Sequence, residues 1–144
     1  MTQPHIHRHS VTVEWGDCDP AQIVFYPTYF KWFDQSTWRL FGSVGLTRAS
    51  LRERFGIIGH PLVSVGCDFK IASRPGDTLV IQSHVRQWSR KSFTVDHSVQ
   101  TPEGTVTASG YETRVWAIHK PGTADQLATL PIPEEVVRLL GGTI

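Results

Sequence analysis

Two aspartates on either side of a cysteine are the residues of this chain best suited to chemistry. Asp17, Cys18 and Asp19 are followed by Pro20, and an aromatic-rich segment begins at Phe25. Proline cannot donate a backbone hydrogen bond, so a regular strand must end here and at least one acid should point away from it. Loops that carry acids before a helix often hold active sites, but aspartates near proline also cap turns and helix starts. Both interpretations stay open for the pair alone.

Cys18 is a rival nucleophile in this loop. Its two neighbours are acids, which disfavour the thiolate and so lower its reactivity. We therefore predict that Cys18 is a packed small residue and that Asp17 belongs to a turn or an interface.

Length, composition and charge exclude several classes of protein. The 144 residues fit one domain, and 40% hydrophobic with 19% charged residues excludes a disordered chain. A net charge of +1 gives no general attraction to nucleic acid or to an anionic membrane, so any anion site must be local. Two cysteines make no disulfide framework, and we find neither a leader before Val11 nor an apolar run of membrane-spanning length. We expect a reduced, soluble, cytoplasmic protein.

The elements that must position the acids are a strand, a long helix and then several strands. Alternation from Val11 to Gly16 predicts a half-buried strand. Apolar residues at helical spacing after Pro27 predict a helix that stops near Gly45. A second helix is predicted over Ser50–Phe55, with Thr47 as its cap.

Antiparallel strands are predicted for most of the remaining chain. Turn residues separate the apolar runs, which alternate with the period of a strand. The expected strands are Leu62–Lys70, Thr78–Trp88, Phe93–Val99 and Thr105–His119, followed by a polar loop over Lys120–Ala128 and a short helix opened by Pro133. One long helix beside an antiparallel sheet predicts a single α+β domain over residues 1–144.

Four motifs together resemble the 4-hydroxybenzoyl-CoA thioesterase family. They are VEWGDCDP, IVFYPTYFKWFD, GIIGHPLVS from Gly56 and WSRKSF from Trp88, and they occur in the family's order. The resemblance covers most of the chain from about Val11 to Trp116. It implies a hot-dog fold, in which a long central helix packs on a curved antiparallel sheet, and it implies acyl-CoA thioesterase activity.

The resemblance places the family's catalytic carboxylate on Asp19, directly before the proline. A carboxylate there could attack the thioester carbonyl to form a mixed anhydride or activate a water, and the sequence leaves both open. A backbone N–H at the start of the aromatic helix is the candidate to stabilise the carbonyl oxygen. The resemblance points to Tyr26 for this role, while its ring could equally be core packing.

Asp34 and His60 are the candidates for the acyl end of the site. An acid on a largely apolar helix needs a partner, so Asp34 either pairs with an Arg or Lys or, by similarity to the family, contacts a ring hydroxyl at the far end of the acyl pocket. His60 lies in the segment that resembles the pocket wall. The family has a smaller hydroxyl residue at this position, which leaves acyl specificity open, and a lone histidine is more often structural.

A predicted hairpin turn carries Ser89, Arg90 and Lys91, which the family likeness favours as a site for the phosphates of CoA over an ordinary solvated turn. His5, His7 and His9 alternate as metal ligands could, but we expect residues 1–9 to form a flexible tail and predict no metal. No cofactor is expected, because coenzyme A is part of the substrate.

Three functions compete at this point. The leading one is hydrolysis of an aromatic acyl-CoA of the 4-hydroxybenzoyl or benzoyl type. An aliphatic or carrier-linked acyl thioesterase of the same fold is the second, and Pro27 argues mildly against it, because that branch commonly has a histidine there. A non-catalytic acyl-CoA-binding module is the third. Exposed sheet edges and the family likeness predict a homo-oligomer, a dimer or a tetramer formed as a dimer of dimers, with no nucleic acid or membrane partner.

Overall fold

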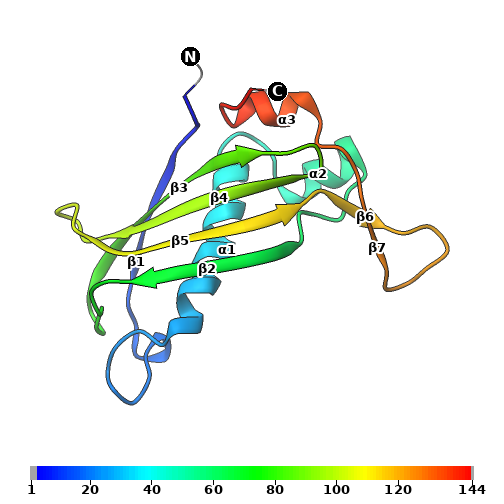
Figure 1. Cartoon of the computed structure of the whole chain (residues 1–144). Coiled ribbons are helices and arrows are strands. Elements are labelled where there is room, and N and C mark those ends of the chain that lie inside the picture. Colours follow the sequence, from blue (N-terminus) through cyan, green and yellow to red (C-terminus); the bar gives the residue numbers. More distant parts are fainter. Residues whose placement is uncertain (1–2, 144) are drawn as a thin grey trace.

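One curved antiparallel sheet wraps around one long helix (Figure 1). The computed structural model describes residues 3–143. The sheet has the order β1-β3-β4-β5-β2, and β6 and β7 form a separate ladder. The elements are β1 (His7–Thr12), the 3-10 turn η1 (Trp15–Asp17), α1 (Tyr26–Gly42), α2 (Arg48–Phe55), β2 (Leu62–Phe69), β3 (Thr78–Trp88), β4 (Ser92–Gln100), β5 (Val106–Val115), β6 (Ala117–His119), β7 (Leu127–Thr129) and α3 (Glu134–Leu139). This arrangement confirms the predicted α+β class.

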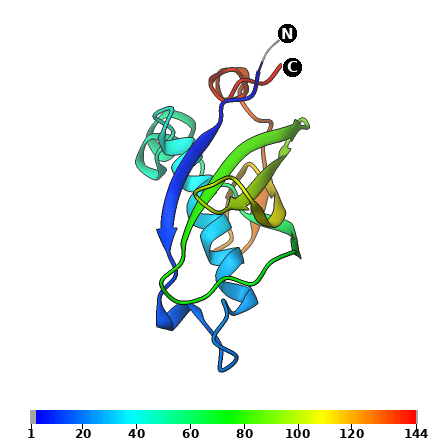
Figure 2. The same cartoon turned by 90° about the vertical axis from the view of Figure 1, so that its left-hand side faces the viewer.

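Helix α1 forms where the apolar spacing predicts it. Pro27 lies in its first turn, where its missing N–H costs no hydrogen bond. Phe33, Leu40 and Phe41 are completely buried, and the turned view shows how the sheet curves around the helix from β1 to the other strands (Figure 2). The helix ends at Gly42, three residues before the predicted stop, and Gly45 instead forms the following turn with a φ of 83°.

The sheet approaches α1 closely at Gly110. A Cβ atom at this position would clash with the Phe33 ring and lie 2.9 Å from the Gly66 carbonyl oxygen, so a side chain here would displace the ring from its place on the sheet. The missing side chain lets the Phe33 ring stack on His97, with ring centroids 4.7 Å apart and planes within 2°. This contact sets the middle of α1 directly over β4 and β5.

Strand β1 corrects two predictions about the start of the chain. The predicted flexible tail is wrong for His7–His9, which pair in register with β3, and His5 donates its N–H to the Leu140 carbonyl. Residues 1–2 lie outside the described residues. The predicted strand also ends too late, because Trp15 belongs to η1 and is 72% exposed.

Two further predictions differ in their boundaries. Thr47 caps α2 as predicted, because its hydroxyl accepts the Ser50 N–H, and the helix begins at Arg48. The long strand predicted over Thr105–His119 is divided at Trp116 into β5 and β6. Strand β6 leaves the main sheet to pair with β7, which begins inside the segment predicted as a loop and ends one residue beyond it.

The core consists of two apolar clusters along α1. One surrounds the first half of the helix and includes Phe33, Ile81 and Val99. The other surrounds its second half, α2 and α3, and includes Leu40 and Trp116. Polar side chains occupy the space between the clusters. Within residues 3–143, no helix combines the length and the apolar character that a membrane crossing requires.

Candidate active site

Asp19 begins a tight loop in front of α1. A bridge between Cys18 and Val24 closes the loop, and the Asp19 carbonyl accepts the Gln22 N–H at 2.8 Å. The Asp19 carboxylate turns back on this loop, where Oδ1 accepts the Ala21 N–H at 2.8 Å. No residue in the described part of the chain donates to Oδ2. The loop thus fixes the carboxylate through one oxygen and leaves the other available to a substrate.

Asp17 and Cys18, the two residues before Asp19, have local roles, as predicted. Asp17 accepts the Glu14 N–H through its carboxylate and the Phe25 N–H through its carbonyl, so it ties η1 to the start of α1. The Cys18 thiol donates to the Glu14 carbonyl at 3.5 Å. Loss of solvent and the charges of Asp17 and Asp19 raise the pKa of Cys18, which opposes formation of a nucleophilic thiolate.

The first turn of α1 presents a free backbone donor beside this loop. Among the described residues, no acceptor faces the Tyr26 N–H, whereas the Phe25 and Thr28 N–H groups are both paired. The Tyr26 ring is 59% exposed, so the alternative of core packing is wrong within one chain. A free N–H at a helix N-terminus favours negative charge on an approaching oxygen.

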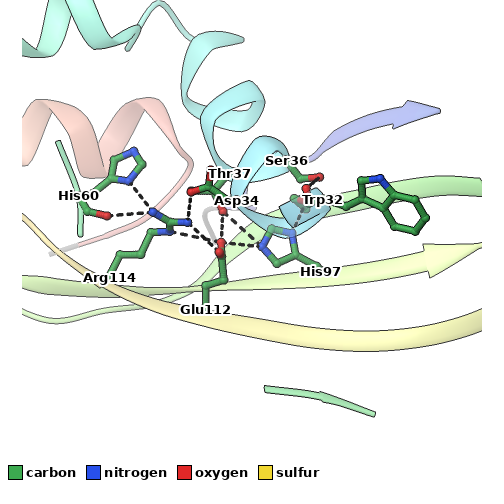
Figure 3. A network of polar contacts seen from close by, with 9 residues as sticks. Trp32, Asp34, Ser36, Thr37, His60, His97, Glu112 and Arg114 are labelled. Carbon is green, nitrogen blue, oxygen red and sulfur yellow. Dashed lines mark hydrogen bonds and ion pairs between the residues drawn. The ribbon is translucent and has the colours of Figure 1, made fainter. Parts of the chain in front are cut away.

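A buried chain of polar side chains crosses the sheet under the middle of α1 (Figure 3). It begins at Ser83 on β3, whose hydroxyl contacts Nδ1 of His97 on β4 at 2.7 Å. Nε2 of His97 is 3.0 Å from Oε1 of Glu112 on β5, which also accepts the Thr37 hydroxyl of α1. The chain continues from Glu112 to Arg114, and there it leaves the core.

Arg114 uses all five of its N–H groups (Figure 3). Two of them bind Glu112, from Nε to Oε1 at 3.3 Å and from Nη2 to Oε2 at 2.7 Å. Nη2 also donates to Oδ1 of Asp34 at 2.8 Å. Nη1 donates to the His60 carbonyl at 3.0 Å and lies 3.4 Å from Nδ1 of the same residue. One guanidinium thereby joins β5, α1 and the segment before β2.

Burial and Arg114 set the protonation states in this network of polar side chains. Burial alone would raise the pKa of Glu112, but hydrogen bonds from His97 and Arg114 and the positive guanidinium lower it to about 2. Burial lowers the pKa of His97, and burial and the Arg114 charge lower the pKa of His60 to about 3. Near neutral pH the network therefore holds an ionised Glu112 between a neutral His97 and a charged Arg114.

Serine, histidine and glutamate in this order resemble a nucleophilic triad, but their burial excludes that role. Ser83 is completely buried and His97 is 2% exposed, so no substrate reaches the hydroxyl. Glu112 is ionised and accepts from Nε2 of His97, which leaves Nδ1 to accept the Ser83 hydroxyl. The three residues form a structural link between strands.

The structure brings Asp34 and His60 together through Arg114. The Asp34 side chain is 51% exposed, and its partner is an arginine, as the salt-bridge alternative predicts. His60 is 2% exposed and its ring lies 4.0 Å from that of Trp38, so the histidine fills the core rather than lining an open surface. Because Arg114 only donates, Nδ1 of His60 must accept, and the proton of the neutral ring lies on the buried Nε2.

The predicted phosphate site lies far from Asp19 within one chain. Ser89, Arg90 and Lys91 connect β3 to β4 at the end of the sheet near α2 and α3, whereas the loop before α1 lies at the other end (Figure 1). The carbonyls of Arg90 and Lys91 accept the N–H groups of Ile132 and Trp116, which fixes the turn.

The face of the sheet opposite α1 carries a hollow of about 510 Å³. His84, Arg86, Asp96 and Tyr111 contribute to its lining, while Asp19, Asp34 and His60 do not. In residues 3–143, His, Cys, Asp and Glu side chains form no group of three suited to a metal ion. The ring centroids of His7 and His9 lie 5.7 Å apart on β1.

Sequence reasoning did not identify His97, Glu112 and Arg114. Their signal is present, because all three occupy alternating positions of β4 and β5 that also carry buried apolar residues: Val95 and Val99 flank His97, and Ala108 and Trp116 lie on the side of Glu112 and Arg114. Strand periodicity therefore indicates buried polar residues, but it does not show which of them meet.

Comparison with known proteins agrees with this geometry. Residues 13–140 match the model of the thioesterase-like superfamily. The chain is 36% identical over 133 residues to the 4-hydroxybenzoyl-CoA thioesterase of Pseudomonas sp. (strain CBS-3), a match that covers 88% of this chain and 92% of the relative.

Solved structures show the same fold. A 4-hydroxybenzoyl CoA thioesterase mutant complexed with 4-hydroxybenzoyl CoA superposes with a TM-score of 0.84 at 33% identity, covering 94% of this chain and 99% of that one. A gentisyl-coenzyme A thioesterase superposes with a TM-score of 0.79 at 36% identity, covering 92% and 99%. The predicted hot-dog fold is thus confirmed, and the chain belongs to the thioesterase-like superfamily as an enzyme that hydrolyses acyl-CoA thioesters.

Proposed function

We propose that this enzyme hydrolyses an aromatic acyl-CoA of the 4-hydroxybenzoyl or benzoyl type to the free acid and CoA. The observation that carries the proposal is the 36% identity to a thioesterase named for 4-hydroxybenzoyl-CoA. The fixed carboxylate of Asp19 beside the free Tyr26 N–H supports it, because thioester hydrolysis needs a nucleophile or base next to a donor for the carbonyl oxygen.

Asp19 is the residue that begins the reaction in this proposal. Its Oδ2 attacks the thioester carbonyl, the C–S bond breaks, CoA leaves as the thiolate, and water then hydrolyses the mixed anhydride. In the alternative course the same oxygen takes a proton from a water that attacks directly. In both, the Tyr26 N–H stabilises the negative oxygen of the tetrahedral intermediate.

Asp34 receives the far end of the acyl group. It lies eight residues after Tyr26 on α1, which is about 12 Å along the helix axis at about 1.5 Å per residue. Its Oδ1 is held by Arg114, and no described residue donates to Oδ2. That oxygen can accept a ring hydroxyl, and His60 closes the space behind Arg114 through its contact with Trp38.

The turn of Ser89, Arg90 and Lys91 binds the phosphates of CoA. Ser89 and Arg90 are exposed, and the carbonyl contacts of the turn hold it in place without using the basic groups. Replacing Arg90 and Lys91 with alanine should raise KM for acyl-CoA roughly tenfold and barely change KM for a thioester that lacks the nucleotide. Lys120→Ala is the control for loss of an exposed positive charge. Equal losses with both substrates would remove the assignment.

A second copy of the chain completes the site. Strand β2 is an edge of the sheet and exposes Leu62 (45%), Val63 (59%) and Phe69 (51%), so it offers both unpaired backbone groups and apolar surface. Pairing of two β2 edges would place residues of a second copy near the Asp19 loop and the turn at Arg90, which lie apart within one chain. We propose a homodimer that can pair again into a tetramer.

Sedimentation tests the assembly. Val63→Glu should shift the wild-type oligomer to monomer and reduce activity, because a charge at a paired edge opposes association. Leu139→Glu is the matched control, since Leu139 is 38% exposed on α3. A wild-type monomer that is stable and active at micromolar concentration would refute the assembly.

Hydrolysis of a panel of aromatic and aliphatic acyl-CoA thioesters tests the function. We expect the highest kcat/KM for 4-hydroxybenzoyl-CoA or benzoyl-CoA. A clear preference for aliphatic thioesters would contradict the proposal. The cytoplasmic location forms part of the proposal and is supported by two cysteines that are both free thiols.

A further inference from the structure

We propose that Arg114, anchored by Glu112, is a positioning residue that fixes the acyl-recognition end of the site. It holds the Asp34 carboxylate of α1 and the His60 backbone in one arrangement. The inference rests on the proposed function, because it concerns the oxygen that Asp34 offers to an acyl group.

The contacts of Arg114 are exclusive and directional. Nη2 donates to Asp34 Oδ1 at 2.8 Å, and no other described residue donates to that carboxylate. Nη1 holds the His60 carbonyl at 3.0 Å, in the segment between α2 and β2. The Asp34 carboxylate and the backbone of the segment behind it thus depend on one planar group whose orientation determines theirs.

Burial makes Arg114 a rigid support. Its side chain is 5% exposed, whereas that of Asp34 is 51% exposed. The arginine therefore holds a solvent-facing carboxylate from inside the core. A surface carboxylate without such a partner would sample several rotamers and lose more entropy when it bound a ligand.

Glu112 fixes the orientation of Arg114. Its two oxygens accept Nε and Nη2, which sets the plane of the guanidinium, and its side chain is 1% exposed. Thr37 and His97 hold the glutamate from α1 and β4. Lysine at position 114 would keep the charge but has three donors on a single atom, so it cannot hold Glu112, Asp34 and the His60 carbonyl in this geometry.

The test compares 4-hydroxybenzoyl-CoA with benzoyl-CoA, which differ by the hydroxyl that Asp34 would accept. Asp34→Asn should lower the ratio of kcat/KM for the first to that for the second by on the order of tenfold. Arg114→Lys should lower the same ratio several-fold, mainly through KM, with kcat for benzoyl-CoA nearly unchanged. In the double variant the ratio should fall no further than in Asp34→Asn, because both changes act on one contact.

Two further variants keep the result interpretable. Arg86→Lys changes an exposed arginine that binds Asp96 on the same sheet, and it should leave the ratio unchanged. Glu112→Gln retains Arg114 with a weaker anchor and should lower the ratio in the same direction, so it serves if Arg114→Lys does not fold. Circular dichroism and thermal unfolding establish folding for each variant.

The outcomes separate the inference from the proposed function. A lower ratio for Asp34→Asn with an unchanged ratio for Arg114→Lys overturns the inference alone. Equal losses on both substrates for Arg114→Lys also overturn it, because they indicate a general structural role. A wild-type enzyme that hydrolyses neither aromatic thioester overturns the proposed function and removes the inference with it.

Discussion

Two carboxylates of this enzyme are held through one oxygen each, by opposite means. Asp19 is fixed by a backbone N–H two residues further along the chain. Asp34 is fixed by Arg114, which is 80 residues away in sequence and rests on a buried network of three strands. A local loop can place a reacting group with few partners, whereas the Asp34 contact requires a folded sheet beneath it. Under the proposed function, Asp19 serves the chemical step and Asp34 serves recognition of the acyl group.

Asp19→Asn should break the chemical side of this comparison with the largest effect. An amide neither attacks a thioester nor accepts a proton from water effectively, so kcat should fall by roughly two orders of magnitude or more while substrate binding is largely retained. Steady-state kinetics with an aromatic acyl-CoA measure the change. Cys18→Ser should remain active, and a comparable loss in that variant would make Cys18 the nucleophile.

Glu112→Gln should weaken the buried network that supports Asp34. Replacing the carboxylate leaves Arg114 buried with less compensation, and the free energy of unfolding should fall by about 2 kcal/mol. Asp96→Asn removes the exposed partner of Arg86 and should cost about 0.5 kcal/mol or less. Urea unfolding at matched protein concentration compares the two. Equal losses would show that the buried network is no more stabilising than a surface pair.

The same contrast explains which parts of the structure could be predicted from sequence. The Asp19 loop, the start of α1 and the cap Thr47 depend on neighbours in the chain, and the sequence predicts them nearly to the residue. The link between Asp34 and Arg114 depends on strand register and on the close approach allowed by Gly110, so sequence indicated an Arg or Lys partner without naming it. The sequence predicts a tail for His7–His9, the first half of β1, because these histidines conceal the alternation of the strand.

The neutral His60 predicts a pH dependence of stability. Its pKa is lowered from 6.5 to about 3 in the folded chain, so between these values the unfolded chain binds more protons and stability falls as pH falls. His60→Asn should reduce the slope of unfolding free energy against pH by about one proton, or about 1.4 kcal/mol per pH unit, between roughly pH 4.5 and 6. The stability that ionised Glu112 contributes is lost at lower pH, as the pH falls from 4.5 toward 2.

Exposed His119 provides the control for this experiment. His119→Asn should leave more of the pH slope intact than His60→Asn. If the two variants have the same slope, the buried imidazole does not stay neutral in the folded chain.

Gln22 offers the smallest test, of the loop that holds Asp19. It has a φ of 64°, the only positive value outside glycine among the described residues. The left-handed conformation costs a side-chain-bearing residue about 1 kcal/mol, so Gln22→Gly should be neutral or stabilise by less than about 1 kcal/mol. Ala21→Gly, which lacks this strain, should destabilise. A large loss in Gln22→Gly would mean that the side chain itself supports the loop.

The division between chemistry and recognition is tested most directly by measuring Asp19→Asn and Asp34→Asn side by side on 4-hydroxybenzoyl-CoA and benzoyl-CoA. We predict that Asp19→Asn lowers kcat on both substrates by similar factors, because the thioester is the same in each. Asp34→Asn should reduce kcat/KM selectively for the hydroxylated substrate. If Asp34→Asn abolishes turnover of both substrates while Asp19→Asn remains active, Asp19 does not carry the chemistry and Asp34 is not a recognition residue.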